Sequence, residues 1–365
     1  MRQIYLDSNA HLPMSKNTLK VYQDFNNSIA GHGNPSSPSV PGRAAASALE
    51  SSRRKIAKLI GAEDASQIIF TNGGTQACHW GMRMLSTRFI GLTYISIIEH
   101  PAVTQGCEAE KGLIYSKLDV TSDGVVLFSK NIDPGSVACT HIQNEIGTIQ
   151  DIKSINYSSC GVFSDFSQSL GKIPVNVKDL GVDIGVFCSH KFGGPSGVGF
   201  IYIKNHSSWI EFGSGSRYFM DIPGTPNVGG IVATAAALEE ALSTLNIRTE
   251  KMLSFQNALE KSLIDFNFEV IGKNVSRSPN TTFVKTPTNV NALSLMLELG
   301  TLGIHCGLGS ACGSLYTGGS PLMNALGRKS DGQEYLRFSQ FGDYDDKDAK
   351  FVISKIEKVL NVLSR

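Results

Sequence analysis

Lys191 stands at the end of an apolar run, and its position is the strongest chemical signal in the sequence. Residues 182–188 predict a buried strand, and Ser189-His190-Lys191 follows this strand directly. Burial disfavours the charged form of an amine and lowers its pKa, so a lysine at this place can act as a nucleophile. Such an amine can form a Schiff base with an aldehyde cofactor. Taken alone, Lys191 could equally be a solvated lysine in a loop.

Two other groups have the chemistry to hold a phosphorylated pyridine. Thr71-Asn72-Gly73-Gly74-Thr75 runs from a predicted strand into a predicted helix. Glycine backbone N–H groups and a helix N-terminus attract a phosphate, although many such turns are purely structural. Asp165 ends another predicted strand, and Gln168 follows it. A buried carboxylate needs a cationic partner such as a pyridinium nitrogen, but Asp165 could also cap the next helix.

Three further side chains could take part in a reaction. His100 follows a strand and could stack on an aromatic ring and carry a proton, or could be a hydrogen-bonded core histidine. Cys312 lies in Gly309-Ser310-Ala311-Cys312-Gly313-Ser314, where small residues suit a mobile nucleophile, or simply a free thiol. Arg337, on a predicted strand, could bind a carboxylate with two hydrogen bonds, or could be a surface residue.

Short apolar runs alternate with helical patterns through the first two-thirds of the chain. Several runs are apolar throughout, as strands buried on both faces of a sheet are. The alternation favours an α/β fold with a mostly parallel sheet and helices on both sides. Strands are predicted over 67–71, 93–98, 137–142, 162–165, 184–189 and 198–203, and helices over 43–60, 75–85 and 231–245.

Polar clusters stand at or just past the ends of five of these strands. Open α/β sheets bind ligands at the carboxyl ends of their strands, so we expect these clusters to meet at one edge. The five are Gly73-Gly74-Thr75, Glu99-His100-Pro101, Asn144-Glu145, Asp165 and Lys191.

The pattern changes after residue 246, and a second, smaller α/β domain is predicted there. A helix over 251–266 leads into a mixed segment, and a helical stripe over 345–363 closes the chain. We expect the N-terminal residues to join this part. The predicted domains are therefore 15–250, a large cofactor-binding domain, and 1–14 with 251–365, a small domain that carries the Cys312 loop.

The composition of the chain argues against some classes of protein. The 365 residues are 41% hydrophobic and 18% charged with a net charge of +1, which argues against strong non-specific binding to nucleic acid or acidic membranes. There is no signal peptide and no apolar stretch of membrane-spanning length. Seven cysteines without CxxC spacing indicate free thiols, and we expect a cytoplasmic protein without a metal site.

These residues together resemble the cysteine desulfurases of the NifS/IscS group, which belong to the fold-type-I pyridoxal-phosphate enzymes. The likeness spans almost the whole chain and keeps the order of the motifs. It rests on Tyr5-Leu6-Asp7, Gly33-Asn34-Pro35-Ser36-Ser37, Ile69-Phe70-Thr71-Asn72-Gly73-Gly74-Thr75, Glu99-His100-Pro101-Ala102-Val103, Asn144-Glu145-Ile146-Gly147-Thr148, Gly171-Lys172-Ile173-Pro174, His190-Lys191-Phe192, Gly197-Val198-Gly199, Gly224-Thr225 and Gly309-Ser310-Ala311-Cys312.

The resemblance implies a large domain with a mostly parallel seven-stranded sheet and a role for each matching residue. Lys191 would bind pyridoxal 5'-phosphate covalently and move protons, and His100 would stack on its ring. Cys312 would take sulfur from L-cysteine as a persulfide and release alanine. The cofactor would also be held by Gly74, Thr75, Asp165 at the pyridine nitrogen, Gln168 at the phenolic oxygen, Ser189, His190 and, from the other subunit of a homodimer, Thr225; the substrate would be bound by Asn34, Asn144 and Arg337.

The chain departs from the family pattern at several places. His11-Leu12 replaces two threonines, and Cys188 replaces a serine that lies two residues before the histidine of the lysine motif. Ser189 is predicted to supply the missing hydroxyl to the phosphate. Ile222 lies where an arginine is usual, and Gln143 replaces the first residue of an Asn-Asn-Glu motif.

The sulfur acceptor is the least determined part of this interpretation. The sequence ends at Arg365, without the tail by which housekeeping members contact an iron–sulfur scaffold. We therefore expect a specialised acceptor protein, in a pathway such as DNA phosphorothioation. The alternatives are a housekeeping sulfur donor for iron–sulfur clusters or tRNA thiolation, another pyridoxal-phosphate lyase or aminotransferase, and a cofactor-free scaffold that kept the fold.

Overall fold

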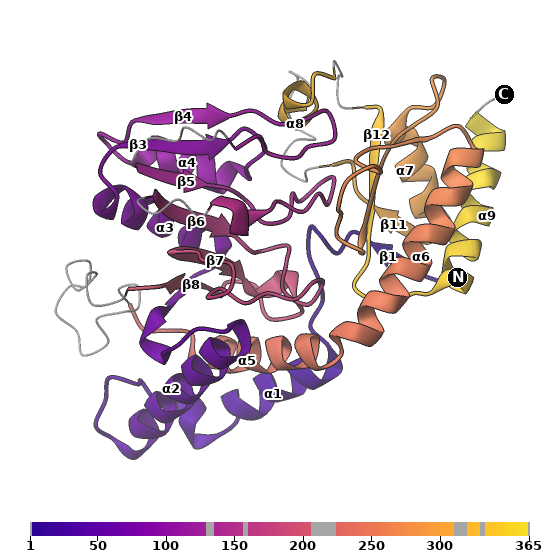
Figure 1. Cartoon of the computed structure of the whole chain (residues 1–365). Helices are drawn as coiled ribbons and strands as arrows, with labels where there is room; N and C mark the ends of the chain where they lie inside the picture. Colours follow the sequence, from indigo (N-terminus) through magenta and orange to yellow (C-terminus); the bar gives the residue numbers. More distant parts are fainter. Residues whose placement is uncertain are drawn as a thin grey trace.

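A sheet of seven strands forms the centre of the protein (Figure 1). The computed structural model describes residues 2–128, 135–155, 160–205, 224–309, 320–328 and 333–363. All neighbouring strands of the sheet are parallel except β8, which runs antiparallel to both of its neighbours. In spatial order the strands are β2 (Ile68–Thr71), β8 (Gly199–Ile203), β7 (Ile184–Cys188), β6 (Cys160–Asp165), β5 (Gly135–Ala138), β3 (Leu92–Ser96) and β4 (Tyr115–Leu118).

Both faces of this sheet are covered by helices, because successive side chains of each strand point to opposite faces. Helices α3 (Gly74–Arg88) and α4 (Pro101–Ala109) cover one face, where Phe163 and Val186 belong to their apolar cluster. Helices α2 (Val40–Ile60) and α5 (Val228–Ser243) cover the other face, with Val162 and Phe187. The predicted α/β class with a mostly parallel seven-stranded sheet is confirmed.

Two small sheets and three helices form a second region. Strand β1 (Ile4–Leu6) pairs in parallel with β11 (Ile304–Cys306), so the two ends of the sequence lie together here. Their apolar side chains share one cluster with the three helices. The other elements are β9 (Glu269–Val270), β10 (Thr281–Lys285), β12 (Tyr335–Ser339), α6 (Leu245–Asp265), α7 (Ala292–Thr301) and α9 (Asp346–Leu363).

The boundary predicted at residues 250 and 251 falls inside α6, which runs without interruption through this position (Figure 1). The division of the chain into two domains stays a prediction. The separate apolar cluster around Leu259, Leu295 and Ile356 is compatible with it.

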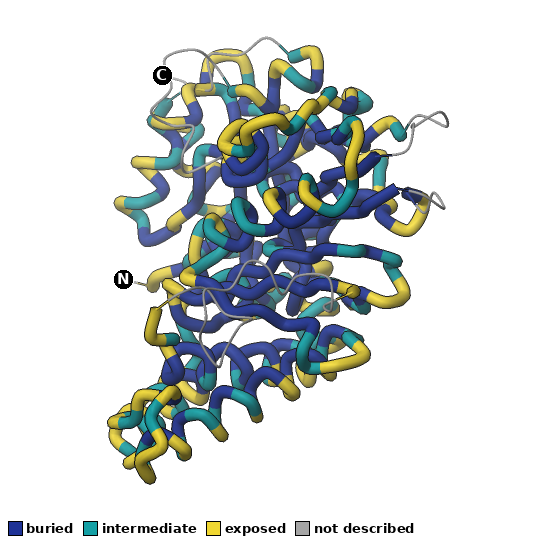
Figure 2. The backbone as a smooth tube through the Cα atoms, turned by 90° about the vertical axis from the view of Figure 1, so that its left-hand side faces the viewer, coloured by how far each residue is buried: buried dark blue, intermediate teal, exposed yellow. Residues whose placement is uncertain are grey.

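The remaining elements connect or cover these regions. Helix α1 (Lys16–Asn26) packs on α5, and α8 (Pro321–Ala325) is a single short helix. Figure 2 shows that the sheet strands are buried while the outer turns of the surrounding helices are exposed. The 3₁₀ turns are η1 (Ile29–His32), η2 (Ala65–Gln67), η3 (Ile152–Ile155) and η4 (Ser189–Lys191).

Among the described residues, no single helix is both long and apolar enough to span a bilayer. Helices α5 and α6 satisfy the length and composition criteria only when taken together, and they are bent by 68° relative to each other.

Candidate active site

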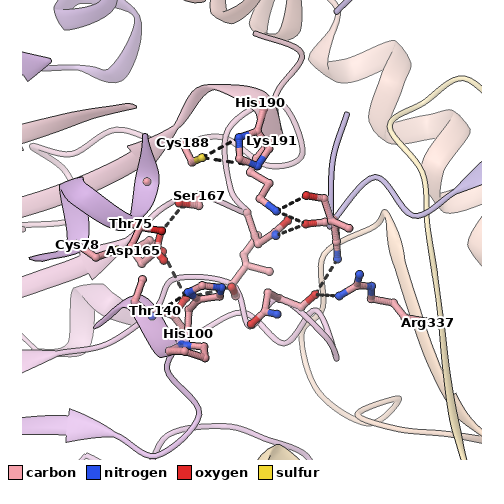
Figure 3. A pocket seen from close by; sticks show the side chains of 18 residues that line it. Thr75, Cys78, His100, Thr140, Asp165, Ser167, Cys188, His190, Lys191 and Arg337 are labelled. Atoms are coloured by element: carbon pink, nitrogen blue, oxygen red, sulfur yellow. Dashed lines mark hydrogen bonds between the residues drawn. The ribbon is translucent and has the colours of Figure 1, made fainter. Parts of the chain in front are cut away.

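One pocket lies at the carboxyl ends of the parallel strands, as the sequence predicts (Figure 3). Segments far apart in the sequence meet there, because parallel strands end at the same edge of the sheet. The predicted residues that line the pocket are Gly74, Thr75, His100, Asn144, Asp165, Gln168, His190, Lys191 and Arg337.

Lys191 ends η4, directly after the buried strand β7, so its amine reaches the pocket. Its Nζ donates hydrogen bonds to the backbone oxygens of Asn9 and Ala10, both at 2.6 Å. Burial lowers the pKa of the Lys191 amine, and the nearby Arg337 cation lowers it further. A lowered pKa increases the fraction of neutral, nucleophilic amine near neutral pH.

Asp165 is the last residue of β6, and its side chain reaches the same pocket. Its Oδ1 accepts a hydrogen bond of 2.8 Å from the backbone N–H of Ser167, and the residue is 7% exposed. The second carboxylate oxygen, Oδ2, forms no hydrogen bond to another described residue. It can therefore accept a hydrogen bond from a ligand in the pocket.

His100 caps the N-terminus of α4 and is held as a neutral imidazole. Its Nδ1 accepts a hydrogen bond of 3.1 Å from the backbone N–H of Ala102, so the ring proton must lie on Nε2. Burial lowers the pKa of His100. Nε2 is therefore the atom from which His100 can donate or exchange a proton.

Glu99 lies next to His100 and is buried. Burial raises the pKa of its carboxyl group well above the usual range, although one oxygen accepts a hydrogen bond of 2.7 Å from the backbone N–H of Thr140. Its Oε2 is buried and makes no hydrogen bond among the described residues. A neutral Glu99 adds no negative charge beside the imidazole.

The N-terminus of α3 forms one end of the pocket. Helix α3 begins at Gly74, and Gly73 before it offers no side-chain cap. The backbone N–H of Gly74 is hydrogen-bonded to the Cys188 sulfur, and the N–H groups that follow in the first turn can bind an anion. A Cβ atom on Gly74 would lie 2.9 Å from the Cβ of Cys188. Only glycine therefore fits at this position.

Cys188 and His190 lie at the same end as a pair of neutral groups. Their Sγ and Nδ1 atoms are 3.2 Å apart, and His11 stacks on the His190 ring with centroids 5.3 Å apart. Burial raises the pKa of the Cys188 thiol to about 11 and lowers the pKa of His190 to about 4. The two residues therefore provide hydrogen-bonding groups without charge near neutral pH.

Arg337, on β12, lines the opposite end of the pocket and is 2% exposed. Its Nη2 donates to Asp7 at 2.6 Å, and its Nη1 donates to the backbone oxygen of Asn144 at 3.0 Å. Its Nε is buried and has no hydrogen-bond partner among the described residues. An unpaired buried donor of a cation is suited to an anionic ligand.

Several residues of the site, such as Thr140 and Ser167 in the pocket wall, were not singled out from the sequence. Asn9 and Lys172 were also missed, although both stand in or beside motifs of the sequence. Asn9 lines the pocket two residues after Tyr5-Leu6-Asp7 and accepts hydrogen bonds on its backbone oxygen from Gln168 Nε2, at 3.0 Å, and from Lys191. Lys172 is fully buried and donates to the side chains of Asn9 and Gln168. Its place in Gly171-Lys172-Ile173-Pro174 was the signal that could have identified it.

Ser189 does not lie where the predicted phosphate contact needs it. It is fully buried, and its Oγ lies 2.7 Å from Oγ1 of Thr234 on α5. The hydroxyl is not part of the pocket wall, so the proposal that it replaces a phosphate ligand has no support from the geometry. Ser189 begins the 3₁₀ turn η4 directly after β7, and in this turn its hydroxyl faces α5.

The other predicted site residues lie elsewhere. Asn34 is exposed outside the pocket, and its Oδ1 accepts a hydrogen bond of 2.9 Å from the backbone N–H of Ser36. Thr225 is exposed and does not line the pocket of its own chain. Cys312 and Ile222 lie outside the described residues.

The residues of the pocket fit pyridoxal phosphate. A half-buried amine of lowered pKa suits the aldehyde, a carboxylate at the end of β6 suits the pyridine nitrogen, and the uncapped N-terminus of a 15-residue helix suits the phosphate. Lys191, Asp165 and Gly74 with Thr75 would hold these three parts of the molecule.

Comparisons with known proteins show the family to which the chain belongs. A sequence model of the class-V aminotransferase family matches residues 4–349. A cysteine desulfurase of Sinorhizobium fredii is 32% identical to this chain, with 100% of this chain and 98% of the relative covered. The cysteine desulfurase IscS of Dictyoglomus turgidum is 31% identical, with 99% and 95% covered. A solved structure of a NifS-like protein matches with a TM-score of 0.88 and 27% identity, over 99% of this chain and 100% of the other.

Proposed function

Because the chain belongs to the class-V aminotransferase family of pyridoxal-phosphate enzymes, we propose that it removes sulfur from L-cysteine as a cysteine desulfurase. The observation that carries the proposal is the meeting of Lys191, Asp165 and His100 with Arg337 in one pocket. The likeness to proteins named cysteine desulfurases over the full length supports the same activity.

Bound pyridoxal phosphate would withdraw electrons from the substrate and weaken its Cβ–S bond. Lys191 would bind the cofactor and move protons through its amine. Asp165 would accept a hydrogen bond from the ring nitrogen. His100 donates a proton from Nε2, since its Nδ1 is occupied by the backbone N–H of Ala102.

The substrate carboxylate is assigned to the Arg337 end of the pocket. Arg337 keeps one buried N–H without a partner, and Asn144 lies beside it. The Asn144 Oδ1 accepts a hydrogen bond of 3.3 Å from Gln143 Nε2, which leaves the Asn144 amide hydrogens for a ligand. Gln143 thus keeps the side chain of Asn144 oriented despite its departure from the family pattern.

Cys312 is proposed to accept the sulfur. Its thiolate attacks the substrate sulfur, the Cβ–S electron pair stays with the organic product, and the thiol becomes a persulfide. The persulfide would then pass its outer sulfur to an acceptor protein. The six described cysteines are all free and buried, and burial raises the pKa of the Cys306 thiol to about 12. None of these six is as well suited to reach a partner as a cysteine in a loop of small residues.

The proposal includes a homodimer in which Thr225 contacts the cofactor of the other subunit, and a cytoplasmic location. Size measured by light scattering would test the dimer. Mixing Lys191→Ala and Thr225→Ala proteins would test the shared site, because a mixed dimer would regain one intact site.

Spectra and mass analysis of the cofactor-loaded protein test the activity. We expect L-cysteine to be converted to alanine, and a mass increase of one sulfur atom on Cys312. Cys312→Ala should keep the visible absorbance of the cofactor and lose sulfide release. Undiminished persulfide transfer by Cys312→Ala would contradict the proposed role of Cys312.

The acceptor is proposed to belong to a DNA phosphorothioation system. Transfer of radioactive sulfur from the loaded enzyme to purified candidate acceptors tests this. Transfer only to an iron–sulfur scaffold protein would overturn the specialised pathway and leave the desulfurase activity intact.

A further inference from the structure

Lys172 is a buried cation for which the chemistry above has no use. It lies in the turn after β6 and is fully buried. Among the described residues, no carboxylate forms an ion pair or hydrogen bond with it. Burial lowers its pKa well below the usual range, and the charges that add to this effect are the cations Lys191 and Arg337. An apolar side chain of similar volume would fill this space at a lower energetic cost, so the lysine calls for another explanation.

The hydrogen bonds of Lys172 determine which way two side-chain amides point. Its Nζ donates to Oε1 of Gln168 and, at 2.9 Å, to Oδ1 of Asn9. The Lys172 amine is the donor in both contacts, so both amides turn their oxygen toward it. The backbone oxygen of Asn9 can only accept, and Gln168 Nε2 lies 3.0 Å from it. Two independent partners therefore require the same orientation of the Gln168 amide.

The orientation of the Asn9 amide is fixed in the same way. Its Oδ1 also accepts a hydrogen bond of 2.9 Å from Asn280, and its Nδ2 donates to Thr281 Oγ1 at 2.9 Å and to the Asn144 backbone oxygen at 3.1 Å. Asn9 therefore joins the segment after β1 to β10 and to the loop of Asn144. The backbone oxygen of the same residue accepts the hydrogen bond from Lys191.

We propose that Lys172 is a positioning residue: its amine holds the Gln168 side chain with Nε2 directed toward the pocket and holds Asn9 as the acceptor for Lys191. Nε2 carries two hydrogens and makes one hydrogen bond among the described residues, so one N–H stays available to the phenolic oxygen of the cofactor. The inference rests on one part of the proposed function: the pocket binds pyridoxal phosphate, with Gln168 at its phenolic oxygen.

The consequence is a change in the titration of the bound cofactor. An N–H donated to the phenolic oxygen favours its deprotonated form, and loss of this donor raises the pH at which the chromophore loses its proton. The groups that face Lys191 in the same site are Cys188 on β7, Asp165 on β6, Arg337 on β12 and Asp7 after β1. None of these is altered in the variants of Lys172 and Gln168, so they act equally on all of them.

The test is a pH titration of the visible absorbance of the cofactor-loaded protein, in a double-mutant cycle. Lys172→Met should raise the midpoint by about one unit, and Gln168→Met should raise it by a similar amount. In the double variant the two shifts should be clearly less than additive, because Lys172 acts through Gln168. Full additivity, or an unchanged midpoint in Lys172→Met, would overturn the proposal.

Arg277→Met is the matched control. Arg277 is a half-buried cation that is paired with Glu260, and it does not line the pocket. Its replacement should lower stability without moving the midpoint, which separates a general loss of packing from the positioning effect. If Lys172→Met does not fold, a crystal structure of the cofactor-loaded wild-type protein tests the contact between Lys172 and Gln168 directly. A Lys172 Nζ more than about 4 Å from Gln168 Oε1 would contradict the proposal.

The readout does not use desulfurase activity. If the wild-type protein does not release alanine from cysteine, the proposed function is refuted. The titration of the bound cofactor would still test the positioning role of Lys172.

Discussion

The two ends of the pocket are built from different kinds of groups. At the α3 end, the groups beside the helix N-terminus are neutral, because burial keeps the Cys188 thiol protonated and the His190 imidazole uncharged. At the opposite end, the Arg337 cation donates hydrogen bonds to the carboxylate of Asp7 and to the backbone oxygen of Asn144. The phosphate of the cofactor would thus be bound mainly by backbone groups and the helix dipole, and the substrate by charge.

This difference explains where the sequence can depart from its family. His11 and Cys188, both departures, lie at the neutral end, where backbone N–H groups do not depend on the side chains around them. At the charged end Gln143 is a departure that keeps the hydrogen bonds of the turn, since its Oε1 accepts from the backbone N–H groups of Glu145 and Ile146 at 2.7 and 2.8 Å. Substitutions are therefore expected to be more harmful at the charged end.

The largest effect is expected for Arg337→Met. Loss of a charge-assisted pair to the substrate carboxylate should raise KM for cysteine about 100-fold, or about 3 kcal/mol, with a smaller change in kcat. Steady-state kinetics of the loaded enzyme measure this. Arg337→Lys keeps the positive charge but loses the planar guanidinium. Its KM for cysteine should therefore lie between those of the wild type and Arg337→Met. An unchanged KM in Arg337→Met would show that the substrate is held elsewhere.

The pH dependence of stability tests whether the buried His141 is neutral in the folded protein. Its backbone N–H donates to the backbone oxygen of Asp165 at 3.0 Å, and burial lowers the pKa of its imidazole to about 4. The unfolded chain binds a proton near pH 6.5, so it holds more protons than the folded chain between pH 6.5 and 4. Stability should therefore be lost as the pH falls through this window, by about 3 kcal/mol for this residue.

His141→Gln should remove this part of the pH dependence. Urea unfolding of both proteins at several pH values gives the difference, in which the contribution of other groups cancels. A constant difference between pH 7 and pH 4 would contradict the neutral state of His141.

Cys188→Ser addresses the departure at the neutral end. A hydroxyl donates hydrogen bonds better than a thiol, so the affinity for pyridoxal phosphate should rise by about fivefold, or about 1 kcal/mol. Titration of the apoprotein with the cofactor, followed by absorbance, measures the change. Weaker binding of the cofactor by this variant would mean that the thiol itself has a role that serine lacks.

Ser189→Ala is the neighbouring control and should have the smallest effect on the cofactor. Its hydroxyl is bonded to Thr234 and lies outside the pocket, so the cofactor affinity should change less than about twofold. The unfolding free energy should fall by about 1 kcal/mol because Thr234 loses a buried partner. A large loss of cofactor affinity would instead support the predicted contact between the Ser189 hydroxyl and the phosphate.

Much of the fold could be predicted from the sequence, because buried parallel strands carry uninterrupted apolar runs. The predicted strands over 162–165 and 184–189 correspond to β6 (Cys160–Asp165) and β7 (Ile184–Cys188). Strand β4 (Tyr115–Leu118) was missed, since it is an edge strand with exposed residues and carries no apolar run. The helix predicted over 251–266 begins earlier, at Leu245, because the turn after α5 contains no glycine or proline to separate the two helices.

The sequence alone determined which chemical groups the site contains, because strand ends and glycine turns fix where Lys191, Asp165, His100 and Gly74 must stand. Only the tertiary structure decided how these groups are oriented. The direction of a hydroxyl or an amide depends on partners in other segments, as for Ser189 with Thr234, 45 residues away, or for Lys172 with Asn9, 163 residues away. Spacing along the chain carries no information about such contacts, and so the positioning role of Lys172 became visible only in three dimensions.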